Sequence, residues 1–164
     1  MSPNERAEEA KMAERSAQGQ PTEGPREVVV RGSAAGFAQE ISVGPHQLRA
    51  DEPVAAGGAD SGPSPYDLLC AALGACTSMT IGLYARRKNW PVEKITVRLR
   101  HAKIYAQDCA ECETKEGYLD RIECDIELKG ALSGEQRSRL IEIANKCPVH
   151  RTLTSEISIR TRLV

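Results

Sequence analysis

The sequence predicts an α+β fold in which short antiparallel strands accompany one long apolar helix. Three observations support this class. A strand-like pattern follows residue 26, an apolar helix begins after residue 64, and a later pair of alternating strands precedes a shorter helix. A chain of 164 residues has the size of one domain with a real core. We therefore expect a single domain over residues 26–164.

The N-terminal segment, residues 1–25, differs in composition from the rest of the chain. It is polar, is rich in Glu, Ala and Gln, and ends in a stretch that contains Pro and Gly. This composition predicts a flexible tail. The segment lacks the apolar run and the cleavage site of a secretory signal, so we expect a cytoplasmic protein.

Three short strands are predicted after the tail. Apolar residues lie in segments 28–30, 41–43 and 48–50, and Gly or Pro residues separate them. This pattern predicts a meander. Turn-forming Gly and Pro residues recur over residues 51–63, which we expect to form a loop.

A long helix is predicted from Ser64 to about Lys88. Ser64 is a typical N-cap, Pro65 suits the first helical position, and Asp67 is placed to complete a capping box. Apolar or small residues occur on every side between residues 68 and 83, whereas a surface helix has one apolar stripe.

Such a helix must be covered on all sides, and the remaining elements of this chain can cover only part of it. A second copy of the chain would supply the missing cover, with Ala71, Gly74 and Ala75 allowing close approach. We therefore predict an intertwined homodimer. A membrane span would need about 20 predominantly apolar residues, but this segment also carries Thr77 and Thr80.

Charge and aromatic content exclude other partners. The formal net charge is −1, and aromatic residues make up 4% of the chain. Neither a basic patch for nucleic acid or membrane nor a set of rings for stacking on bases is present. We expect no nucleic acid partner and no membrane partner.

The second half of the chain predicts a hairpin followed by a helix. Alternating apolar positions in residues 95–99 and 122–128 predict two strands, with their loop at residues 106–117. Ser133 opens a second capping box, and the following helix is expected to place Cys147 in its last turn before Pro148 stops it. Alternation over residues 157–163 predicts a final half-buried strand.

Six cysteines occur, and in a reducing compartment we expect them to be thiols. Cys109 and Cys112 form a C-x-x-C pair, which is typical of a redox couple or of half a zinc site. Neighbouring carboxylates disfavour thiolates, which argues against a thioredoxin-like role. The nearest further ligands, His101 and Cys124, lie roughly 15 Å down the hairpin. We therefore predict no metal and no cofactor. Cys70 and Cys124 are expected to be core residues.

Three motifs together resemble the OsmC/Ohr family: Ser64 to Leu69, Ala72 to Thr77, and Lys146 to Leu153. The resemblance spans nearly the whole chain after the tail. It implies an OsmC-like fold, with antiparallel sheets packed around a long central helix in a homodimer. In that family one cysteine lies in the central helix and a second precedes a Pro and a His. The pair reduces organic hydroperoxides.

By this resemblance, Cys76 is the peroxidatic thiol and Cys147 the resolving thiol. The family also implies recycling by a dithiol or a small-thiol reductant. Burial of Cys76 in an apolar helix raises the thiol pKa, so a nearby cation is needed for a reactive thiolate. Arg31, Arg49 and Arg151 are candidates, and we favour Arg49 because its strand leads toward the helix.

One position departs from the family pattern. Peroxidase members carry a Glu ten residues before the reactive cysteine, where this chain has Tyr66. Tyr66 can donate a hydrogen bond to a peroxide oxygen, or it can simply pack. The leading hypothesis is a thiol peroxidase that uses Cys76 and Cys147 in oxidative-stress defence. The alternative is a non-catalytic dimer that binds an apolar ligand or a metal, or acts as a redox sensor.

Overall fold

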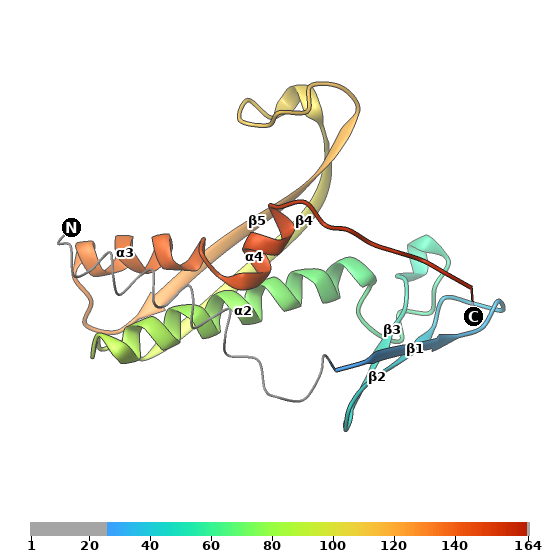
Figure 1. Ribbon diagram of the computed structural model, residues 1–164, viewed down its shortest axis with the longest axis horizontal. Coiled ribbons are helices and arrows are strands. Elements are labelled where there is room, and N and C mark those ends of the chain that lie inside the picture. The colour runs from blue at the N-terminus through green and yellow to red at the C-terminus, as the bar shows by residue number, and fades with distance from the viewer. Residues whose placement is uncertain (1–25, 164) are drawn as a thin grey trace. The chain divides into compact units, whose positions relative to one another are not determined.

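The structure is a computed structural model that describes residues 26–163. The predicted flexible tail, residues 1–25, lies outside the described residues. The described chain forms two compact units, which divide between Gly62 and Pro63. Figure 1 shows the elements of each unit.

The N-terminal unit is a three-stranded antiparallel sheet with the order β1-β2-β3, which confirms the predicted meander. Gly44 has a positive φ of 57° in the tight turn between the second and third strands, a conformation that glycine adopts without a steric penalty. The elements are β1 (Val28–Gly32), β2 (Gln39–Val43), β3 (His46–Ala50) and the short 3-10 helix η1 (Val54–Ala56).

Asp51 organises the loop that follows β3. The Asp51 carboxylate accepts hydrogen bonds from the backbone N–H groups of Glu52, Ala59 and Ser61, and from the Ser61 hydroxyl. These bonds lower the pKa of Asp51, with the Ser61 contacts contributing most. The loop over residues 51–63 is therefore ordered by one buried carboxylate.

Helix α2 (Pro65–Arg87) dominates the C-terminal unit. Its predicted capping box is confirmed: Ser64 Oγ accepts from the Asp67 N–H at 3.2 Å, and Asp67 Oδ2 accepts from the Ser64 N–H at 2.9 Å. By length and composition alone α2 could also cross a membrane. It instead packs against β4, α3 and α4 (Figure 1).

An antiparallel hairpin and two further helices complete this unit. The hairpin strands pair from Lys94 with Lys129 to Tyr105 with Tyr118, and their loop covers residues 106–117 as predicted. The elements are β4 (Lys94–Tyr105), η2 (Ala106–Asp108), β5 (Tyr118–Lys129), α3 (Gly134–Ala144) and α4 (Pro148–Leu153). The fold is therefore α+β, with antiparallel sheets and a long central helix.

Helix α2 buries one stripe in this single chain. Gly74 lies against β4 so closely that an added Cβ would come within 2.7 Å of Leu99 Cδ1. The absence of a side chain at Gly74 thus allows close packing of α2 against β4 within the chain. The opposite side of α2 is uncovered, with Met79 72% exposed and Ala71 and Ala75 also exposed.

Two further predictions are wrong for the described chain. Residues 157–163 form no strand, and Ile159 is 83% exposed, because no neighbouring strand pairs with this segment in the single chain. Cys124 and Cys70 are not core residues: Cys124 is exposed and Cys70 is only partly buried. Cys124 pairs in register with Leu99, which contacts Gly74 of α2, but this packing leaves the Cys124 side chain itself exposed in the single chain.

Candidate functional site

Cys147 occupies a different structural position from the predicted one. Helix α3 ends at Ala144, and Cys147 is the N-cap of the next helix, α4, with extended backbone angles of φ −63° and ψ 144°. Pro148 is the cause, because a proline disfavours helical angles at the residue before it and suits the first position of a new helix. Pro148 therefore begins a helix instead of only ending one.

The Cys147 thiol is fully buried, with 0% exposure. Its Sγ accepts a hydrogen bond from the His150 N–H at 3.3 Å, as an N-cap side chain does. Thr77 Oγ1 of α2 lies 3.5 Å from the same sulfur. The sulfur thus sits between the beginning of α4 and the middle of α2, at the positive end of the α4 dipole.

Cys76 lies in the middle of α2, is partly exposed, and is directly beside Cys147. Burial raises the pKa of the Cys76 thiol above its usual value, and the adjacent Cys147 thiol raises it further. The Val149 backbone N–H and the Thr80 hydroxyl act in the opposite direction because they donate hydrogen bonds to the sulfur. Burial is the largest of these effects.

Backbone N–H groups in the first turn of α4 donate hydrogen bonds to both sulfur atoms. Val149 N–H donates toward Cys76, and the next residue, His150, donates its N–H to Cys147. The first N–H groups of a helix have no partner within the helix, and they carry its positive potential. Each sulfur atom therefore has a fixed backbone N–H donor that stabilises a negative charge developing on it.

The structure places Tyr66 in contact with His101. The two rings stack with centroids 4.0 Å apart and an interplanar angle of 6°. His101 Nε2 lies 2.8 Å from Asp120 Oδ1, which also accepts from Lys103 Nζ at 3.0 Å. Ten residues of helix separate Tyr66 from Cys76, about 15 Å along the axis. Tyr66 therefore belongs to a polar cluster on the hairpin.

Arg49 lies on β3, where it is exposed and pairs in register with Glu40. It belongs to the N-terminal unit, whereas Cys76 belongs to the C-terminal unit. Its role as the activating cation stays a prediction. Arg151 lies on α4 and is exposed.

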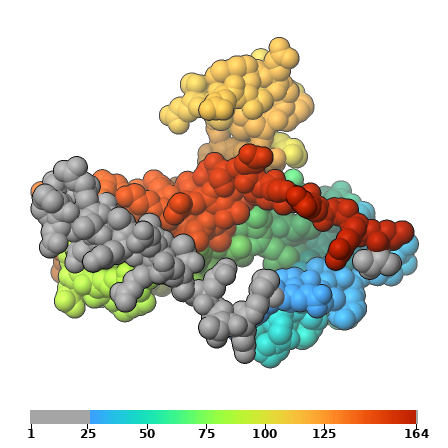
Figure 2. All heavy atoms as spheres, viewed as in Figure 1, coloured from blue at the N-terminus to red at the C-terminus, as the bar shows by residue number. Residues whose placement is uncertain are grey.

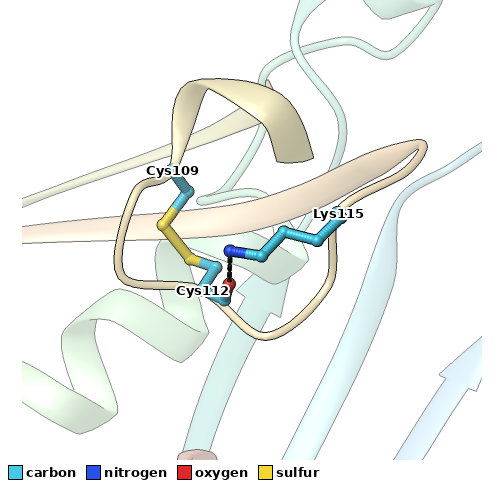
Figure 3. Close-up of a disulfide and its surroundings, with 3 residues drawn as sticks. All are labelled: Cys109, Cys112 and Lys115. Carbon is cyan, nitrogen blue, oxygen red and sulfur yellow. Dashed lines mark hydrogen bonds between the residues drawn. A yellow bond between two sulfur atoms is a disulfide. The ribbon is translucent and has the colours of Figure 1, made fainter.

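Cys109 and Cys112 are joined by a disulfide, so the expectation of thiols is wrong for this pair (Figure 3). The pair cannot ligate a metal in this oxidised form, because a metal ligand must be a thiolate. Within residues 26–163, no group of three or more His, Cys, Asp or Glu side chains is placed to hold a metal ion.

The sequence motifs point to Cys76 and Cys147 but not to the groups around them. Thr77, Thr80 and the backbone of Val149 contact the sulfur atoms. The Cys-Pro dipeptide is the signal that predicts an N-cap at Cys147. Thr77 and Thr80 lie one and four positions after Cys76, so their proximity follows only after the helix is packed against α4.

Comparison with known proteins identifies the class to which this fold belongs. The family model described as OsmC-like protein matches residues 58–162. The chain therefore belongs to the OsmC-like family. No curated protein sequence matches it significantly.

Solved structures share the fold at low sequence identity. The chain is similar to an organic hydroperoxide resistance protein of Legionella pneumophila, with a TM-score of 0.61 and 18% identity over 82% of this chain and 92% of that one. A protein of the same description from Elizabethkingia anophelis gives 0.62 and 19% over 82% and 91%. The Bacillus subtilis organic hydroperoxide resistance protein OhrB gives 0.57 and 20% over 79% and 90%.

Proposed function

We propose that the protein is a thiol peroxidase that reduces organic hydroperoxides through Cys76 and Cys147. The observation that carries this proposal is the direct contact of two free thiols from α2 and α4, one partly exposed and one fully buried. Family membership and the similarity to organic hydroperoxide resistance proteins support the substrate class.

The difference in exposure favours Cys76 as the thiol that carries out the first step. A hydroperoxide can reach a partly exposed sulfur but not one with 0% exposure. The Cys76 thiolate attacks the terminal peroxide oxygen, the O–O bond breaks, and the alcohol leaves after it takes up a proton. Cys76 becomes a sulfenic acid and the hydroperoxide is reduced by two electrons.

The neighbouring thiol completes the oxidation. Cys147 attacks the Cys76 sulfenic sulfur, a disulfide forms, and water leaves. The His150 N–H donates to the Cys147 sulfur in the reduced protein and stabilises negative charge there. A dithiol, or two equivalents of a small thiol, then reduces the disulfide by exchange and restores both thiols.

Activation of Cys76 requires more than the backbone donors. Its pKa is raised because burial outweighs the hydrogen bonds from Val149 and Thr80. We assign the missing positive charge to Arg49. Tyr66 lies about 15 Å along the helix axis from Cys76, so we assign to its hydroxyl a contact with the far end of a bound hydroperoxide and not with the peroxide oxygen at the sulfur. The Tyr66 side chain is 44% exposed, which leaves it accessible to a bound molecule.

The uncovered side of α2 supports a homodimer. Met79 and Leu83 are exposed on a central helix, and Ile157 and Ile159 are exposed on the C-terminal segment. A second copy would remove these apolar side chains from water. We propose that the active protein is a cytoplasmic homodimer.

The raised pKa of Cys76 favours a second candidate, a redox sensor that reacts slowly with hydroperoxide. Few thiolates at neutral pH mean slow attack. The two functions predict different rates from the same site, so one kinetic experiment separates them.

Single-turnover kinetics with cumene hydroperoxide test the proposal. The protein should lose two thiols per molecule, and Cys76→Ser should lose none. Cys70→Ser is the matched control, because Cys70 lies on the same helix and its pKa is also raised by burial. Equal reaction of Cys76→Ser and wild type would remove Cys76 from the mechanism. A rate no greater than that of free cysteine would favour the sensor.

A further inference from the structure

We propose that the Cys109–Cys112 disulfide is a second redox site, which exchanges electrons with a dithiol on a positively charged partner. The pair lies in the loop at the end of the β4–β5 hairpin and is separate from the two thiols of the peroxidase proposal. It does not depend on that proposal.

The loop is accessible. Figure 2 shows the atoms of residues 106–117 as a knob that stands apart from α3 and α4. Both cysteines are partly exposed, and Ala110 and Glu111 between them are exposed. A disulfide that must exchange needs this access, because the attacking sulfur approaches in line with the S–S bond.

The hairpin does not need the disulfide for its architecture. Twelve register pairs join β4 and β5, and the last is Tyr105 with Tyr118, whose rings lie 4.5 Å apart. The cross-link spans a sequence separation of only 3 residues. Stabilisation by a cross-link grows with the length of the loop it closes, so a link this short contributes less than one that closes a long loop.

The site cannot exchange with Cys76 of its own chain in this structure. Helix α2 contacts β4 at Leu99, where Gly74 packs, and the disulfide lies beyond Tyr105. Six residues of strand between Leu99 and Tyr105 cover about 20 Å. The end of the hairpin also projects away from α2 (Figure 1). The exchange partner is therefore a separate molecule.

The negative charge of the loop indicates that the partner carries positive charge around its dithiol. Residues 106–117 contain four carboxylates and one ammonium group, and the carboxylates are Asp108, Glu111, Glu113 and Glu116. All four are exposed. This negative surface attracts a dithiol set among positive charges and repels one set among negative charges. The exposed rings of Tyr105 and Tyr118, where the two strands join the loop, offer the partner an additional apolar contact.

Lys115 distinguishes the two sulfur atoms. Its Nζ donates to the Cys112 carbonyl oxygen at 2.6 Å, which holds the ammonium group beside Cys112 (Figure 3). A thiolate released at Cys112 is stabilised by this charge, so Cys112 is the better leaving group. Cys109 is then the sulfur that the partner attacks.

The exchange conserves atoms and electrons. A partner thiolate forms a bond to Cys109 Sγ, the Cys109–Cys112 bond breaks, and the Cys112 thiolate takes up a proton. The second partner thiol then attacks the partner sulfur of the mixed disulfide. The partner leaves as a disulfide, oxidised by two electrons, and Cys109 and Cys112 become thiols. The surrounding carboxylates disfavour thiolates and so argue against an attacking, thioredoxin-like role for this pair, but in this exchange the partner supplies the attacking thiolate and the pair is the disulfide that is attacked.

The test uses the full-length wild-type protein and two synthetic Cys-x-x-Cys peptides, one flanked by lysines and one by glutamates. Disulfide opening is followed by alkylation and peptide mapping, which reads Cys109 and Cys112 separately from Cys76 and Cys147. At low salt the lysine peptide should react about tenfold faster or more, and high salt should abolish the difference. Dithiothreitol, as a neutral small dithiol, should give an intermediate rate at both salt concentrations.

A separate experiment tests which of the two sulfur atoms is attacked and which one leaves. A monothiol, 2-mercaptoethanol, should form its adduct on Cys109 and leave Cys112 open to alkylation. Lys115→Met should slow opening several-fold, and Lys94→Met, at the far end of the hairpin, should not. Cys109→Ser/Cys112→Ser should keep the wild-type melting temperature and the wild-type reaction of Cys76 with hydroperoxide. Equal rates with both peptides, or a disulfide that resists excess dithiothreitol in the folded protein, would overturn the proposal.

Discussion

Cys147 caps helix α4 by accepting the His150 N–H at a distance of 3.3 Å from its Sγ. This hydrogen bond gives the buried thiol a structural role beside its proposed chemical one. The same helix turn directs the Val149 N–H at Cys76. Variants at Cys147 can therefore separate the stability of the site from its chemistry.

Replacement of Cys147 should affect stability according to capping strength. Cys147→Ala removes the acceptor and should lower the free energy of unfolding by about 1 kcal/mol. Cys147→Ser keeps an acceptor oxygen and should lose less. Urea unfolding of both variants measures the difference. A serine variant less stable than the alanine variant would show that the cap does not stabilise the fold.

The same two variants should trap the intermediate. Without the resolving thiol, Cys76 oxidised by hydroperoxide should persist as a sulfenic acid, which dimedone labels. Wild type should show little label because Cys147 closes the disulfide. Equal labelling of wild type and Cys147→Ser would exclude Cys147 as the resolving thiol.

The rate of Cys76 oxidation should rise with pH. Burial raises the pKa of this thiol above its ordinary value of 9.0, so the reactive thiolate becomes more abundant as the pH increases through and beyond that value. If Arg49 supplies the activating charge, wild type should react well at neutral pH, and Arg49→Met should move the pH profile to higher values. Arg31→Met tests the other candidate arginine of the N-terminal sheet and should leave the profile unchanged. Identical profiles for wild type and Arg49→Met would remove Arg49 from the site.

The apolar face of α2 should mediate association. Met79→Glu places a charge at an exposed apolar position and should shift the protein toward monomer in light scattering. Glu93→Lys changes the charge of an exposed residue outside α2 and should leave the dimer intact. A wild-type protein that is monomeric at micromolar concentration contradicts the dimer proposal.

Stability of the N-terminal loop should depend on pH through Asp51. Its hydrogen bonds lower its pKa below the ordinary 3.8, so the folded state favours the ionised form. This contribution is present above about pH 4 and is lost as the pH falls through the folded pKa. Asp51→Asn should reduce the acid dependence of the melting temperature between pH 5 and pH 2. An unchanged acid dependence would show that Asp51 does not support the loop.

Gly130 should be intolerant of a side chain. Its φ is 131°, and an added Cβ would overlap the Pro91 carbonyl oxygen. Gly130→Ala should cost about 3 kcal/mol. Gly117→Ala is the control, because its φ is also positive at 78° but its Cβ position is open, so only the backbone cost of about 1 kcal/mol applies. Equal losses would contradict the close contact.

Local signals made much of the fold predictable from the sequence. Ser64 and Ser133 each lie three residues before a side chain that completes a capping box, and both helices begin where these motifs place them. Strand alternation placed the hairpin and its loop at residues 106–117. These features depend on neighbours along the chain, which the sequence displays directly.

Features that depend on tertiary neighbours were not predictable. The alternation over residues 157–163 has the pattern of a strand, but a strand forms only beside a partner, and the single chain offers none there. Pro148, in contrast, is a local signal with two meanings, because a proline can end one helix or begin the next. The first meaning predicted a last helical turn at Cys147, whereas Cys147 is the N-cap of α4. The disulfide at Cys109 depends on loop geometry that the spacing alone leaves open.

The central claim is that Cys76 and Cys147 form a disulfide when the protein reduces an organic hydroperoxide. Peptide mapping by mass spectrometry after one equivalent of cumene hydroperoxide tests it directly. We predict a Cys76–Cys147 linked peptide and one equivalent of cumyl alcohol. Recovery of Cys76 as an unmodified thiol, with the hydroperoxide intact, would contradict it.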